Sequence, residues 1–95
     1  MYVRVVRFTD ATRERVDSAI SMIEAAEGPP EGVRTSRLTL LYDESQQTAV
    51  VTQYFETAED MEEGGKVLSA MGAGETPGTR ASVDMCEIKF DVSAA

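Results

Sequence analysis

The spacing of apolar residues changes several times along the chain, and each change predicts the start of a new element. Residues 2–8 (YVRVVRF) are β-branched and aromatic, which is typical of a strand. Residues 9–28 then change to a helical period. The apolar stripe of this helix consists of Val16, Ala19, Ile20, Ile23 and Ala26. The Gly-Pro-Pro sequence at 28–30 ends the helix.

The middle of the chain predicts a β-hairpin. Residues 36–43 (SRLTLLYD) and 48–56 (TAVVTQYFE) have strand composition, and the polar ESQQ sequence between them predicts a short turn. We therefore expect the two strands to pair antiparallel.

A second helix and a last strand complete the pattern. TAED at 57–60 is a capping box, in which the hydroxyl of Thr57 accepts from the backbone N–H of Asp60. The helix continues to about Met71, and Gly64 and Gly65 within it either permit close approach to a sheet or are simply tolerated. The stripe of this second helix that is expected to face the sheet consists of Met61, Gly65, Leu68 and Met71. Residues 72–79 are then expected to form a loop, and residues 80–92 the last strand.

This order of elements, β-α-β-β-α-β, predicts an α+β fold of the ferredoxin-like type. In that fold one antiparallel sheet carries two helices on one face. The length of 95 residues predicts a single domain over residues 1–95.

A four-residue turn predicts the register of the hairpin: Tyr42 lies opposite Ala49 and Leu40 opposite Val51. A turn one residue shorter or longer would re-pair the strands. In either register, Thr52 and Gln53 point to opposite faces. The face expected under the helices holds Leu38, Leu40, Tyr42, Ala49, Val51, Gln53 and Phe55.

The other face of the hairpin is too apolar to be left in water. Two helices cover only one side of a four-stranded sheet, so the simplest cover is a second copy packed sheet against sheet, which predicts a homodimer. The alternative is an unusually apolar exposed face. The predicted interface residues are Thr39, Leu41, Val50, Thr52 and Tyr54.

Composition narrows the class of partner. The net charge of -8 disfavours nucleic acid and anionic membranes as partners, since both require clustered basic residues. No run of residues is long and apolar enough for a membrane span, and the N-terminal residues do not form a signal peptide, so we expect a soluble cytoplasmic protein. Cys86, the single cysteine, is expected to be a buried, inert thiol in a strand.

The segment YDESQQTAVVTQYFETAEDM (42–61) resembles the dimeric α/β-barrel superfamily, which includes the antibiotic-biosynthesis-monooxygenase-like domains. The resemblance rests on Asp43 in a polar turn, Phe55 ending a strand, then Glu56, Thr57 and an acidic helix start, and covers nearly the whole chain in element order. It implies a homodimer with facing sheets and a pocket between sheet and helices in each subunit.

The sequence departs from the superfamily in its catalytic groups. Haem-degrading members share an Asn, a Trp and a His, and this chain contains none of these residue types, with Phe55 at the Trp position and Arg7 near the Asn position. Haem ligation by imidazole is therefore excluded. Histidine, the commonest general base near neutral pH, is therefore absent as well. We expect no cofactor and no metal site.

Several polar residues could still line a pocket. Arg4 and Arg7 have opposite alternation parity, so one faces each side of the sheet. We expect a structural ion pair, with Asp84 and Glu87 as the acidic partners, or a charge at the sheet edge; an anion-binding role is the alternative. The predicted ligand-pocket residues are Arg7, Tyr42, Gln53 and Phe55.

Whether the chain is an enzyme stays open at this point. The favoured function is a non-catalytic binding or assembly module. The alternatives are a cofactor-independent monooxygenase- or isomerase-like enzyme acting on a small apolar or aromatic compound, and a stress- or metabolite-responsive partner protein.

Overall fold

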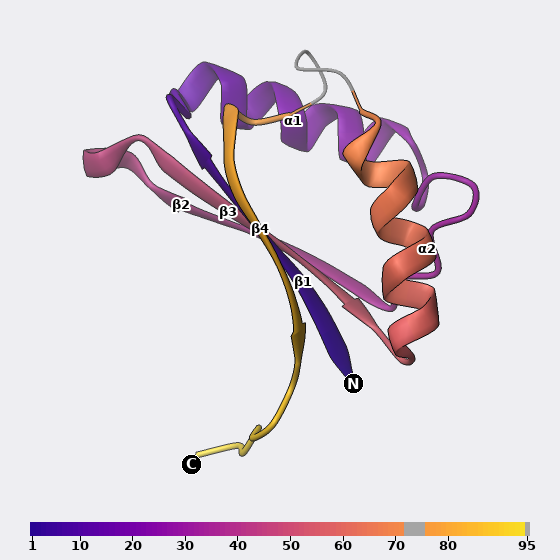
Figure 1. The fold of residues 1–95 in the computed structure, drawn as a ribbon. Coiled ribbons are helices and arrows are strands. Elements are labelled where there is room, and N and C mark those ends of the chain that lie inside the picture. The colour runs from indigo at the N-terminus through magenta and orange to yellow at the C-terminus, as the bar shows by residue number, and fades with distance from the viewer. Residues whose placement is uncertain (72–75, 95) are drawn as a thin grey trace.

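The structure is a computed structural model of the chain that describes residues 1–71 and 76–94. It confirms the predicted order of two helices and four strands (Figure 1). The elements are β1 (Tyr2–Thr9), α1 (Arg13–Ala25), β2 (Arg37–Asp43), the 3-10 turn η1 (Glu44–Gln46), β3 (Thr48–Phe55), α2 (Ala58–Ser69) and β4 (Thr79–Glu87).

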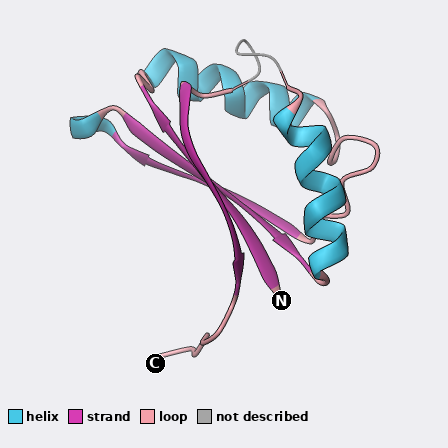
Figure 2. Ribbon diagram, in the orientation of Figure 1, coloured by secondary structure: helices cyan, strands magenta, loops and turns pink. Residues whose placement is uncertain are grey.

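The four strands form one antiparallel sheet in the order β2-β3-β1-β4. Both helices lie on the same side of this sheet, and among residues 1–71 and 76–94 no helix covers the opposite side (Figure 2). This arrangement is compatible with a ferredoxin-like fold. The helix-free side is named the open face below, and the other side the helix face. Neither helix has the length and apolar character to cross a bilayer, within the part of the chain that the structure describes.

Two separate apolar clusters lie between the sheet and the helices. The first joins β1, β3 and the start of α1 and contains Val6, Phe8, Ala11, Val16, Ala49 and Val51. The second joins the end of β3 to α2 and the loop before β2, and contains Val33, Phe55, Met61 and Leu68. The two clusters anchor the two ends of the helix layer to the sheet.

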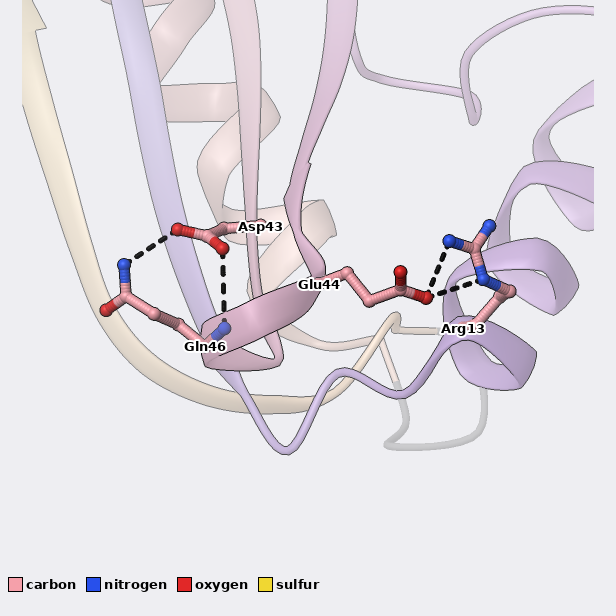
Figure 3. A network of polar contacts seen from close by, with 4 residues as sticks. All are labelled: Arg13, Asp43, Glu44 and Gln46. Atoms are coloured by element: carbon pink, nitrogen blue, oxygen red, sulfur yellow. Dashed lines mark hydrogen bonds and ion pairs between the residues drawn. The ribbon is translucent and has the colours of Figure 1, made fainter.

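The hairpin has the predicted register. Tyr42 pairs with Ala49, Leu40 with Val51 and Leu38 with Gln53. The turn fixes this pairing because Asp43 accepts hydrogen bonds from the backbone and side-chain amides of Gln46 (3.3 and 2.7 Å) (Figure 3).

An ion pair ties the same turn to the first helix. Arg13 at the start of α1 pairs with Glu44 at 2.6 Å (Figure 3). Both side chains are exposed, so this contact positions the turn and adds little stability.

Helix α1 differs most from its prediction. It begins after Thr12, whose hydroxyl accepts from the backbone N–H of Arg15, and it ends at Ala25. Its predicted stripe is only partly buried: Val16 and Ala19 are covered, whereas Ile20 and Ile23 are exposed. The C-terminal half of α1 does not pack onto the sheet, and a pocket lies between this half of the helix and the sheet.

Helix α2 packs closely on the sheet, and its glycines explain why. The predicted capping bond from Asp60 N–H to the Thr57 hydroxyl is present at 3.0 Å. A Cβ at Gly64 would lie 2.9 Å from the ring of Phe55, and one at Gly65 would lie 3.2 Å from the terminal methyl of Met85. Of the two roles considered for these glycines, the structure shows the close approach of helix and sheet.

Strand β4 is shorter than the predicted 80–92. It ends at Glu87, which pairs with Tyr2 at the start of β1. One residue further on, the backbone N–H of Ile88 donates to the backbone oxygen of Met1 at 3.0 Å. Phe90 and Val92 lie beyond the sheet and are exposed. Of the loop predicted at 72–79, residues 72–75 fall outside the described residues.

Candidate functional site: a pocket between sheet and helices

A pocket of about 520 Å³ lies between the helix face of the sheet and the two helices. This volume is in the range that holds a small organic ligand. Its wall is mainly apolar, and its lining residues come from both helices and from all four strands. The apolar lining includes Val6, Phe8, Ala19, Met22, Ile23, Val33, Leu38, Leu40, Val51, Leu68 and Met71. The exposure of Met22, Ile23 and Leu38 follows from this architecture, because they line an open pocket.

The polar floor of the pocket is built on Arg4 and Gln53. These residues pair directly across β1 and β3, and both point to the helix face. Arg4 is only 3% exposed, and its Nη1 donates to Gln53 Oε1 at 3.0 Å. Its Nη2 donates to Ser69 Oγ at 3.2 Å, at the end of α2. The Nε–H is buried without a hydrogen-bond partner among the described residues.

The electrostatic setting of Arg4 is unusual for a buried charge. Burial lowers the pKa of the Arg4 guanidinium, and the positive charge of Arg80 lowers this pKa further. Arg80, at the start of β4, donates from Nη1 to the backbone oxygen of Ser69 at 3.4 Å. Arg4 thus has neutral oxygen partners and a like-charged neighbour.

The expected acidic partners of the β1 arginines lie elsewhere. Asp84 pairs with Val5, so it faces the open side of the sheet, away from Arg4. Glu87 forms an ion pair with Lys89 at 2.6 Å. Within the described residues, no ion pair involves Arg4 or Arg7. The prediction of an Arg–carboxylate pair in the first and last strands is therefore wrong.

Of the four predicted pocket residues, Gln53 lines the pocket. Phe55 also faces the helices, but it is fully buried in the second cluster beneath Gly64. Arg7 pairs with Val50 and is exposed on the open face, whereas Gln53 lies on the helix face. The structure therefore corrects the assignment of Arg7 to a sheet–helix pocket. Tyr42 packs against the first cluster and also borders a smaller hollow of about 240 Å³ beside Arg7.

Sequence reasoning left Ser69 and Arg80 out of this site, and it considered Arg4 for an acidic partner or an anion but did not include it among the pocket residues. The signal for Arg4 was present, because it shares alternation parity with Val6 and Phe8, which are apolar and belong under the helices. No local signal marks Ser69 or Arg80, since they approach Arg4 only through the packing of α2 and β4.

The five predicted interface residues lie together on the open face, on neighbouring strands β2 and β3. Thr39 and Thr52 pair directly, and their hydroxyl groups are hydrogen-bonded to each other. Leu41 is 57% exposed, and Val50 and Tyr54 are half-buried. The guanidinium of Arg37 lies 5.7 Å from the ring centre of Tyr54, at the margin of this apolar surface.

The described residues of the pocket wall include no carboxylate, thiol or phenol. The polar lining consists of arginine, glutamine, serine and threonine side chains, which are poor proton acceptors near neutral pH. No group of three Cys, Asp or Glu side chains is close enough together for a metal ion in the described part of the chain. This arrangement can bind and orient a molecule, and it offers no obvious group for proton transfer.

Comparisons with protein-family models, with curated proteins and with solved structures gave no match to this chain.

Proposed function

We propose that this protein is a non-catalytic binding module for a small, largely apolar molecule. The observation that carries the proposal is the pocket of about 520 Å³, with apolar walls and a polar floor at Arg4 and Gln53. Apolar walls supply affinity, and a few fixed polar groups supply orientation. Gln53 is itself held by Arg4, so the floor is organised before a ligand enters.

A cofactor-independent monooxygenase- or isomerase-like enzyme is the alternative, and it has weaker support. Both kinds of reaction commonly depend on a general base that takes a proton from the substrate. The described lining has no carboxylate, imidazole, thiol or phenol that could accept this proton. Binding without chemistry therefore accounts for more of the site.

We further propose that two copies associate through their open faces, as in the dimeric α/β-barrel superfamily that the sequence resembles. Exposed Leu41 beside half-buried Val50 and Tyr54 supports this proposal, because such a surface gains from removal of water. The hydrogen bond between Thr39 and Thr52 supports it too, because each hydroxyl group already has a hydrogen-bond partner when an interface excludes water.

The binding proposal is tested by calorimetric titration with 1-naphthylmethanol, a neutral bicyclic compound. Met22→Trp places a bulky ring at the pocket wall, and we expect it to reduce the affinity at least fivefold. Ser21→Trp is the control, because Ser21 is exposed on α1 and does not line the pocket. Equal affinity in wild type and both variants would place the binding elsewhere, and absence of binding to wild type would refute the proposal for this class of compound.

A further inference from the structure

Two guanidinium groups meet at the C-terminal end of α2. Arg4 donates to the hydroxyl of Ser69, and Arg80 donates to the backbone oxygen of the same residue. Arg4 comes from the centre of the sheet, and Arg80 from the edge strand β4. Two positive charges from separate strands are thus gathered at one end of the pocket, where both residues contribute to the wall.

The charge of the pocket is opposite to the charge of the protein. The chain carries nine basic residues and seventeen acidic ones. Even so, the described residues that line the pocket include Arg4 and Arg80 and no Asp or Glu. Arg37 also borders the pocket, but its guanidinium lies over Tyr54 on the open face. A random sample of this chain's charged residues would be mainly acidic, so the selection of arginines at the pocket is a specific feature.

The present partners of Arg4 only partly offset its charge. Gln53 and Ser69 supply neutral oxygens, and the carbonyl groups at the end of α2 supply the negative end of a helix dipole. Burying a guanidinium without a full counter-charge is costly, and the Nε–H of Arg4 lacks even a neutral partner among the described residues. An anion in the pocket would supply the missing charge.

Building on the proposed function, we propose that the ligand is an organic acid, whose carboxylate lies between Arg4 and Arg80 and whose apolar body extends towards α1 and β2. A carboxylate suits this position because guanidinium groups bind it with short, charge-assisted hydrogen bonds. The apolar body would contact Ile23 and Leu40, which line the pocket on α1 and β2. The arginines therefore select the head group, and the apolar wall accepts the remainder.

The test compares 1-naphthoate with 1-naphthylmethanol at neutral pH, by calorimetric titration of the intact protein. The two compounds share a ring system and differ in the charged group. We expect wild type to bind the acid about tenfold or more tightly than the alcohol, as one charge-assisted hydrogen bond would give. Added salt should reduce this preference.

Arg80→Gln is the decisive variant, because Arg80 is exposed and its replacement leaves the core intact. We expect it to lower the affinity for the acid several-fold and to leave the affinity for the alcohol unchanged. Arg4→Met should abolish the preference if the variant folds. Arg34→Gln removes an exposed arginine that does not line the pocket, and it should change neither affinity.

The outcomes separate the two proposals. If acid and alcohol bind wild type equally well, the anion inference is overturned while the apolar pocket stands. If neither compound binds, both proposals fail. A preference for the acid that Arg34→Gln reduces as much as Arg80→Gln reflects overall charge and also contradicts the inference.

Discussion

The ring of Phe55 at the end of β3 fills the space that a side chain at Gly64 of α2 would occupy. A Cβ at position 64 would lie 2.9 Å from Cε1 and 3.2 Å from Cζ of this ring. Phe55 is fully buried, so it has no free space into which to move. The contact sets the distance between α2 and the sheet, and hence the position of Ser69 at the end of the helix.

Gly64→Ala should therefore destabilise the fold by about 1–3 kcal/mol, as overpacking of a core does, despite the higher helix propensity of alanine. Gly65→Ala is the matched control, because its new methyl would meet the flexible end of Met85, which is 46% exposed. Its free energy of unfolding should stay equal or rise by up to about 1 kcal/mol. Urea denaturation measures both, and a Gly64→Ala variant as stable as Gly65→Ala contradicts this account.

The Arg4–Gln53 hydrogen bond should show strong energetic coupling. Gln53→Leu leaves a buried N–H of Arg4 without its acceptor, which should cost about 1–3 kcal/mol. In the double variant Arg4→Met/Gln53→Leu neither polar group is buried, so its loss should be smaller than the sum of the single losses. Denaturant unfolding of the four proteins gives the coupling energy. Additive losses would show that the two side chains do not depend on each other.

Stability at acid pH should depend on Asp43. Hydrogen bonds from Ser45 and Gln46 lower the pKa of this carboxylate in the folded state. A lowered folded-state pKa means that the stabilisation is present above the unfolded-state pKa of about 3.9 and disappears as the pH falls through the folded-state value. Asp43→Asn should thus lose less stability than wild type between pH 5 and pH 3 in thermal unfolding. Glu31→Gln serves as the charge-matched control, and equal acid sensitivity of Asp43→Asn and wild type argues against the turn network.

Association through the open face should respond to a charge at Leu41. Leu41→Glu places a carboxylate on an exposed apolar position, where a packed interface would have to desolvate it. Sedimentation velocity should show a dimer for wild type at micromolar concentration and a monomer for this variant. Ile20→Glu, on the exposed side of α1, should remain dimeric. A monomeric wild type would contradict the proposed assembly.

Much of the fold could be predicted because its determinants are local. The register of the hairpin followed from a four-residue turn, and the start of α2 followed from Thr57 and Asp60. The alternation of β3 placed Gln53 under the helices and Thr52 on the open face, and the structure confirms both placements.

The remaining features depend on the relative position of distant segments. Ile23 is exposed because the C-terminal half of α1 lies away from the sheet. The spacing of apolar residues along the helix does not determine this distance. The end of β4 at Glu87 coincides with its pairing to Tyr2 of β1, and the residues of β4 alone do not determine this pairing. The meeting of Arg4 and Arg80 at Ser69 requires α2, β1 and β4 to be placed together, so an acidic partner was expected where neutral oxygens are found.

The most direct test of the central claim is a methyl-detected NMR titration of the protein with 1-naphthylmethanol. If the compound enters the sheet–helix pocket, the signals of Val51, Leu40 and Ile23 should shift in proportion to occupancy. The methyl signals of Val5 and Leu41 on the open face should not shift. Shifts confined to the open face, or no shifts at millimolar compound, would contradict the assignment of this pocket as the binding site.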